Sequence, residues 1–183
     1  AVEKVVNEVI GKSLLSKDSI FVDMSSTKYE SAKLFYSNLK KTNVHFVDAP
    51  VSGGPEGAKS ATLAIMAGGD ADTFEKIKNI LKTMGNPTLV GPSGSGQVAK
   101  LCNQIIVGVT IGAVAEAVIL CEQVGANPEN FIKAVAGGFA DSKILQNHGA
   151  RMIKKDFAPR GKSITHLKDM DNILKCAKDA SIS

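Results

Sequence analysis

Two spacings of hydrophobic residues alternate along the first ninety or so positions of the chain. Apolar residues between 2 and 10 recur at every third or fourth position, which predicts an amphipathic helix. Residues 20–22 form a short apolar run typical of a buried strand. The same alternation predicts further helices and strands, namely helices over 27–39 and 70–84 and strands over 44–51, 62–67 and 88–90. Alternating strands and helices favour an open, mainly parallel α/β sheet, whose ligands bind beyond the carboxyl ends of the strands.

Local end signals refine these elements. Thr27 and Glu30 have the spacing of a capping box, and Asp70 is the expected N-cap of the helix that ends at Met84-Gly85. The glycine- and proline-rich segment 52–57 is expected to be a loop after its strand.

The pattern changes after residue 93, because no further strand is predicted and helical periods continue to the end. A long helix to about Gly125 precedes helices that begin at Asn127-Pro128, Ser142 and Ser163. Gly108 and Gly112 are four residues apart on the long helix, so another helix can pack unusually close to that face. The chain is therefore predicted to have two domains, 1–93 with the sheet and an all-helical domain over 94–183, joined by a long central helix.

Composition narrows the function classes. With 44% hydrophobic residues among 183, the chain can bury a real core. The net charge of +4 comes from mixed lysines and acids without a basic block, which argues against nucleic acid and suits a small anion. The longest uncharged apolar run, 105–115, is too short to span a bilayer, so no membrane partner is expected.

Cysteine and histidine placement points away from disulfides and metals. Cys102, Cys121 and Cys176 form no close pair, and we expect reduced, buried thiols as in a cytoplasmic protein, with the mitochondrial matrix left open. His45 and His166, like His148, which we expect at the edge of the core, have no ligand spacing with a nearby carboxylate, so no metal is predicted.

The glycine-rich stretch 91–104 is the strongest candidate for chemistry. Gln97 and Val98 occupy the positions where a P-loop needs lysine and a hydroxyl, and no second strand follows to complete a dinucleotide loop. Lys100 lies where the glycines run into the helix, and a lysine positioned there can act as an acid. The alternative for Lys100 is an ordinary solvated helix lysine.

A second candidate is the Ser52-Gly53-Gly54 turn at the end of its strand. Consecutive glycines expose backbone N–H groups, which suit an anion such as a carboxylate. An ordinary strand-ending turn remains the alternative.

Three motifs in this order resemble the β-hydroxyacid dehydrogenase family: Asp-Ala-Pro-Val-Ser-Gly-Gly at 48–54, the stretch 91–104 with Lys100, and His-Leu-Lys-Asp at 166–169. The resemblance covers essentially the whole chain and implies a Rossmann-type sheet, of which this chain holds the carboxyl-terminal part. Family members are about 290 residues long, so about 90 residues with the glycine fingerprint for the cofactor are expected upstream.

The resemblance also implies roles for individual residues. Lys100 would be the general acid/base, Ser52, Gly53 and Gly54 the cradle of the substrate carboxylate, and Ser26 and Lys168 contacts to the cofactor, with Asp169 orienting Lys168. Asn103 and Gln104 lie three and four residues after Lys100, so both can face the substrate, and which of the two is structural stays open.

The implied function is an NAD- or NADP-dependent oxidoreductase that interconverts a small 3-hydroxy acid and its semialdehyde. The run 100–107 favours tartronate semialdehyde (2-hydroxy-3-oxopropionate) as substrate, with 3-hydroxyisobutyrate or a succinic or glyoxylic semialdehyde as alternatives. Two other functions are considered. One is a non-catalytic binding module on the same fold. The other is an enzyme for a phosphorylated sugar acid, which would need several arginines, whereas the sequence has only Arg151 and Arg160. A small carboxylate and a second copy of the chain, in a dimer or tetramer, are the expected partners.

Overall fold

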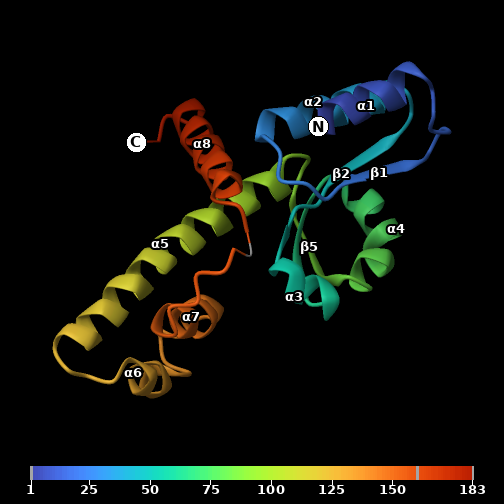
Figure 1. The fold of residues 1–183 in the computed structure, drawn as a ribbon. Helices are drawn as coiled ribbons and strands as arrows, with labels where there is room; N and C mark the ends of the chain where they lie inside the picture. The colour runs from blue at the N-terminus through green and yellow to red at the C-terminus, as the bar shows by residue number, and fades with distance from the viewer. Residues whose placement is uncertain (1, 160, 183) are drawn as a thin grey trace. The chain divides into compact units, whose positions relative to one another are not determined.

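The computed structural model describes residues 2–159 and 161–182. Two compact units are distinguished, one formed by residues up to Asn103 together with those from Asp171, the other by Gln104–Met170. The sheet lies in the first unit, and the boundary between the units falls inside a long helix, ten residues after the predicted one. Figure 1 shows the helices and strands by label.

Five strands form one mixed sheet, made of β1 (Ile20–Asp23), β2 (His45–Asp48), β3 (Val51–Ser52), β4 (Leu63–Gly68) and β5 (Gly85–Gly91). β1 pairs with β2 and β4 with β5 in parallel. β2 and β3 pair with β4 antiparallel in a single register, with Asp48 opposite Gly68 and Ser52 opposite Ala64. The segment predicted as one strand over 44–51 is thus one strand interrupted at Pro50, whose missing N–H leaves only its carbonyl to accept from the Met66 N–H.

Side-chain alternation along the strands builds a core on each face of the sheet. Phe46 and its neighbour Phe21 pack against α1 (Val2–Gly11) and α2 (Tyr29–Lys40), and Val47 points to the opposite face, where α4 (Ala71–Lys82) packs. Figure 1 shows α1 and α2 together, away from α4. Helices therefore cover both faces of the sheet at β2, as expected where strands pair in parallel, whereas every second residue of β5 is exposed.

Several predicted ends are wrong. The capping box at Thr27 does not form, and Lys28 is the N-cap of α2. The Thr27 N–H donates to Gln97, seventy residues further on, and the Thr27 hydroxyl donates to Asp23. The expected loop over 52–57 contains the short helix α3 (Gly54–Lys59), which starts with Pro55 in its first turn. α4 ends at Lys82 rather than at Met84-Gly85, because Gly85 already begins β5. Asp70 is the N-cap of α4 by position, but its carboxylate accepts from the Tyr36 hydroxyl instead of capping.

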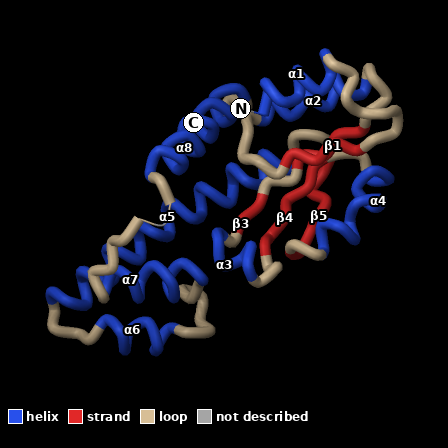
Figure 2. Tube along the Cα trace, turned by 45° about the vertical axis from the view of Figure 1, so that its right-hand side comes forward, coloured by secondary structure: helices blue, strands red, loops and turns tan. Residues whose placement is uncertain are grey.

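The remainder of the described chain is helical. α5 (Ser95–Gln123) is followed by α6 (Pro128–Val135), a π-helical turn η1 (Leu145–Gly149), α7 (Ala150–Ile153) and α8 (Ser163–Asp179), as Figure 2 shows in blue. The Asn127 side chain caps α6 as predicted, accepting from the Asn130 N–H at 2.8 Å. Val114 and Val118 of α5 share a small core with Ile132 and Leu145. A Rossmann-type α/β sheet followed by helices on a long central helix confirms the predicted fold class.

α5 is apolar on most sides. Gly108 does permit a close approach, because a Cβ there would lie 3.2 Å from His166 Nε2 of α8, whereas nothing described lies within 4 Å of a Cβ at Gly112. By length and composition alone α5 could cross a membrane, and only 11% of its most apolar window is buried. Such a helix is weak evidence for a membrane span, since core helices of other proteins pass the same test.

Candidate functional site

The helix that carries Lys100 is capped from the sheet. Asp48, the last residue of β2, accepts from the Gly94 N–H at 2.7 Å through Oδ1 and from the Gln97 N–H at 3.0 Å through Oδ2. The first N–H groups of a helix have no partner inside it, and Gly94 has no side chain to supply one. A strand residue 46 positions earlier therefore performs the capping.

Glycines make this approach possible. A Cβ at Gly96 would lie 2.3 Å from the Met66 carbonyl oxygen, and one at Gly68 would lie 2.7 Å from the Gly96 nitrogen. Both are shorter than any normal contact, so the start of α5 rests directly on the backbone of β4. The glycines of the 91–104 stretch thus serve contact between helix and sheet.

Asp48 is fully buried. Burial raises the pKa of the Asp48 carboxyl above its usual value, and the N–H groups of Gly94, Gln97 and Gly96 only partly offset that rise. These N–H donors offset part of the cost of burying the carboxyl group.

Gln97 connects the same helix turn to the loop after β1. Its Oε1 accepts from the Thr27 N–H and its Nε2 donates to the Ser25 carbonyl, both at 2.9 Å. The side chain is 1% exposed, so both halves of the amide are satisfied inside the protein. Asp23 holds the same loop from the other side, accepting from the Ser25 N–H at 2.9 Å and from the Thr27 hydroxyl at 3.5 Å.

Lys100 lies one turn after Gln97 and is half-buried, as is Asn103 a further turn along. Both belong to the sheet unit. Cys102 between them is exposed, which corrects the expectation of a buried thiol. The direction of each side chain on a helix that is apolar on most sides could not be obtained from spacing alone.

The Ser52-Gly53-Gly54 turn joins β3 to α3 in the same unit. Gly53 and Gly54 have φ values of 139° and 62°, in the region that favours glycine, and Gly53 is the N-cap of α3. Ser52 is half-buried and the two glycines are exposed. Consecutive glycines with positive φ can present backbone N–H groups to an anion.

The remaining predicted residues divide between the units. Ser26 lies in the loop that Gln97 and Asp23 hold. In the helical unit, the Gln104 amide donates from Nε2 to Asp169 Oδ2 at 2.8 Å, and Lys168 Nζ lies 3.2 Å from Asp169 Oδ1. Asp169 is 4% exposed. Its carboxylate connects α8 to α5 through Gln104 and also pairs with the half-exposed Lys168.

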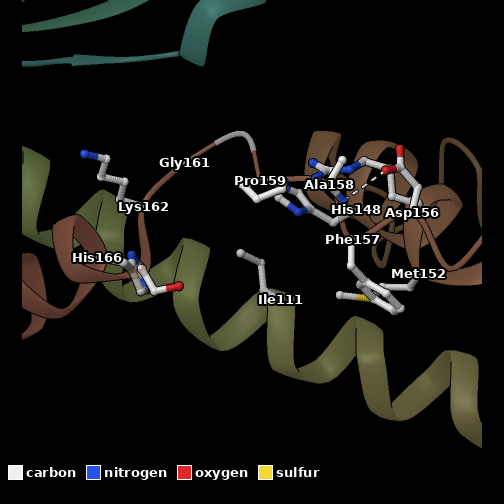
Figure 3. A pocket seen from close by; sticks show the side chains of 12 residues that line it. Ile111, His148, Met152, Asp156, Phe157, Ala158, Pro159, Gly161, Lys162 and His166 are labelled. Atoms are coloured by element: carbon white, nitrogen blue, oxygen red, sulfur yellow. Dashed lines mark hydrogen bonds between the residues drawn. The ribbon is translucent and has the colours of Figure 1, made fainter.

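The helical unit also contains a cavity of ≈ 560 Å³ between α5, the η1–α7 segment and the start of α8. Figure 3 shows Ile111 and Met152 beside His148 and His166 at its wall. Burial first, and then the nearby Arg151 charge, lowers the pKa of His148. None of the predicted site residues lines this cavity, and Arg160 lies outside the described residues.

Sequence reasoning missed Asp48, Asp23 and Gln97 as members of the site. Asp48 belongs to the 48–54 motif, but a role for its carboxylate was not assigned, and Gln97 served only to exclude a P-loop. The available signal was the glycine start of α5, which has no capping side chain of its own. Within residues 2–159 and 161–182, no group of three or more His, Cys, Asp or Glu side chains could hold a metal ion.

Comparison with known proteins relates both parts of the chain to dehydrogenases. Residues 1–108 match the family model described as the NAD binding domain of 6-phosphogluconate dehydrogenase. Residues 94–183 match the model described as NAD-binding of NADP-dependent 3-hydroxyisobutyrate dehydrogenase. The two matches overlap over the first part of α5.

Individual relatives agree with these models. A 2-hydroxy-3-oxopropionate reductase of Escherichia coli is 44% identical over 168 residues, which are 91% of this chain and 58% of that protein. A probable 3-hydroxyisobutyrate dehydrogenase-like protein of Arabidopsis thaliana is 36% identical over 156 residues, 85% of this chain and 52% of that protein. The solved 3-hydroxyisobutyrate dehydrogenase of Mycobacterium tuberculosis with L-serine superposes with a TM-score of 0.85 at 25% identity, covering 98% of this chain and 65% of that one. The chain thus spans between half and two thirds of the length of these proteins.

Proposed function

Because this chain belongs to the β-hydroxyacid dehydrogenase family, we propose that the intact protein is an NAD- or NADP-dependent oxidoreductase that interconverts a small 3-hydroxy acid and its semialdehyde. The observation that carries the proposal is the placement of Lys100, half-buried on a helix turn that Asp48 and Gln97 fix to the sheet. Residues 1–93 would form the carboxyl-terminal part of the dinucleotide-binding domain, and 94–183 the helical domain.

Lys100 is proposed as the general acid in reduction and the general base in oxidation. The bound cofactor supplies or accepts the hydride at the carbonyl carbon. Lys100 donates its proton to the oxygen on which negative charge grows, and in the reverse direction the neutral amine takes the hydroxyl proton. Asn103, on the same side of the helix one turn later, is suited to hydrogen-bond a substrate hydroxyl or carboxylate.

The substrate carboxylate is proposed to bind at the Ser52-Gly53-Gly54 turn. The positive φ values of the two glycines support this role, because such a backbone presents N–H groups that a side chain would otherwise cover. The Ser52 hydroxyl adds a donor at the end of β3. Gln104 is a further candidate for substrate contact, although its amide N–H₂ already donates to Asp169.

Tartronate semialdehyde is the favoured substrate, because the E. coli relative named 2-hydroxy-3-oxopropionate reductase is 44% identical. 3-Hydroxyisobutyrate, a succinic or glyoxylic semialdehyde and phosphorylated sugar acids are the comparison substrates in the assay below.

Ser26 and Lys168 are proposed as cofactor contacts. Both are held in place, Ser26 by the bonds of the residues on each side of it and Lys168 by Asp169. We further propose a homo-oligomer, supported by exposed hydrophobic residues on α5 such as Ile106 and Val109. A cytoplasmic location is proposed, with the mitochondrial matrix as the alternative because the Arabidopsis relative is named mitochondrial.

The test is a comparison of Lys100→Met with wild type in the intact protein, measured as oxidation of reduced cofactor in the presence of tartronate semialdehyde. We expect kcat to fall by about 10²–10⁴-fold, the usual contribution of general acid–base catalysis. The KM for the carboxylate should change little, because Lys100 acts in the transition state.

Lys76→Met is the matched control. Lys76 is exposed on α4, and this substitution removes the same charge from the same unit. The proposal is refuted if Lys100→Met retains turnover within a few fold of Lys76→Met. Activity restricted to a phosphorylated sugar acid would replace the substrate assignment and leave the role of Lys100 in place.

A further inference from the structure

The Gln97 side chain bonds at both ends to the loop after β1, and the Gln97 backbone N–H is bonded to Asp48 of β2. Its amide oxygen and nitrogen each face a backbone group of the right polarity, the Thr27 N–H and the Ser25 carbonyl. An amide matches this pair and a carboxylate does not, because two carboxylate oxygens would place one against the Ser25 carbonyl. Glutamine therefore fits this position because its amide supplies one donor and one acceptor and because its side chain has the right length.

The two bonded residues lie on either side of Ser26. With Ser25 and Thr27 both bonded to Gln97, the loop cannot shift relative to the start of α5 without breaking a partly buried hydrogen bond. Asp23 adds two more bonds to the same residues from the end of β1. Gln97 therefore determines where Ser26 lies relative to the first turns of the helix.

On the other side, Gln97 is one turn before Lys100. Residues three apart lie on the same side of a helix, and the rise between them is about 4.5 Å. The Gln97 N–H is bonded to Asp48, so the rotation of α5 about its own axis is set at this turn. A change at residue 97 is consequently transmitted to Lys100 through a single helical turn.

We propose that Gln97 is a positioning residue, which holds the loop that carries Ser26 and the helix turn that carries Lys100 at a fixed separation. This inference rests on the proposed function, in which Ser26 contacts the cofactor and Lys100 transfers the proton. Gln97 itself transfers no proton and acts through these two segments. Reacting groups that are misplaced by about 1 Å can cost about 10²-fold in rate, so a positioning residue has a measurable effect without contributing chemistry.

The experiment compares Gln97→Met with Thr73→Val in the intact protein. Gln97→Met keeps the length of the side chain and removes both hydrogen bonds. Thr73 is likewise buried in the sheet unit, and its hydroxyl makes one polar contact with His45 Nδ1 at 3.3 Å, on α4 at the opposite face. Thr73→Val thus reports what the loss of a buried polar contact does to the unit when the site is not involved.

Steady-state kinetics, cofactor binding and amide hydrogen exchange are measured at a temperature where both variants are folded. In Gln97→Met we expect kcat at least tenfold below that of Thr73→Val, an unchanged KM for the carboxylate, and a dissociation constant for reduced cofactor, measured by calorimetry, raised at least threefold. Amide hydrogen exchange should show the Thr27 N–H losing its protection in Gln97→Met while the core strands keep theirs. In Gln97→Glu, which restores an acceptor for Thr27 but not a donor for Ser25, we expect protection of Thr27 to return and cofactor affinity to remain weakened.

The inference is overturned if kcat and cofactor affinity of Gln97→Met both lie within threefold of those of Thr73→Val, or if only one of them changes. Its failure can be told apart from failure of the proposed function. If Lys100→Met is inactive and Gln97→Met is fully active, only the positioning role of Gln97 is refuted. If Lys100→Met is active, the proposed proton transfer is refuted, and the inference loses its basis.

Discussion

Replacing Asp48 by asparagine probes the capping of α5 from the sheet. The two carboxylate oxygens accept from the Gly94 and Gln97 N–H groups at 2.7 and 3.0 Å, and Asp48 is fully buried. Asparagine keeps one acceptor oxygen and turns its N–H₂ group toward the other N–H. One buried helix N–H then loses its partner, at a cost of about 1–3 kcal/mol.

We therefore expect Asp48→Asn to lower the free energy of unfolding at pH 7 by about 2 kcal/mol. In a chain of this size that corresponds to a fall in Tm of about 4–8 °C. Urea unfolding followed by circular dichroism measures the difference. Asp70→Asn is the matched control, because the exposed Asp70 carboxylate accepts from the Tyr36 hydroxyl at the surface. This variant should unfold at nearly the wild-type urea concentration.

The pH dependence gives a second check on the same substitution. Because burial raises the pKa of Asp48, the folded protein binds its proton more tightly than the unfolded chain does. The contribution of this group to stability is full below the ordinary aspartate pKa of about 4 and is lost as the pH rises through the raised value. Asparagine does not titrate, so the cost of Asp48→Asn should be larger at pH 4 than at pH 7. A cost below about 0.5 kcal/mol, the usual range for surface changes, would refute the capping argument. A cost that grows toward pH 7 would contradict the raised pKa of Asp48.

Two further outcomes follow from the helical unit and from α5. Burial and the Arg151 charge lower the pKa of His148, so the contribution of His148 to stability is present above the ordinary histidine pKa of about 6.5 and is lost as the pH falls. Between pH 7 and pH 5 the wild type should therefore lose more unfolding free energy than His148→Gln. Equal losses would contradict this expectation. The exposed hydrophobic residues of α5 predict self-association of the intact protein, so equilibrium sedimentation at micromolar concentration should give a dimer or larger species, and a monomer would contradict it.

The elements that depend on local pattern could be predicted from the sequence. Apolar spacing and β-branched runs identified the strands and helices of the sheet unit except for α3, which was expected to be a loop, and the break between β2 and β3. Asn127-Pro128 marked the start of α6 correctly, since its cap partner is three residues away. The capping box at Thr27 failed for the opposite reason. Thr27 bonds to Gln97, seventy residues further on, and no local rule weighs such a partner against Glu30.

The candidate site likewise contains residues that local pattern identified and residues that it could not identify. Lys100 and the Ser52-Gly53-Gly54 turn were singled out because their residue types and spacing suggest chemistry. The side chains that hold α5 against the sheet, Asp48 and Gln97, are recognisable only when segments 46 to 72 residues apart are brought together. The exposure of Cys102 was missed because a helix that is apolar on most sides gives no sign of which side is covered.

The unbroken register of β2 and β3 against β4 restricts how this protein can vary. Between Asp48 and Ser52 the chain pairs with β4 without a bulge, and neighbouring side chains in a strand point to opposite faces. Deleting a single residue at Ala49 would therefore turn Ser52 toward the other face of the sheet while Asp48 stayed under the helix. Substitutions can accumulate along this strand, but its length between the two residues should be the same in every folded version of the protein.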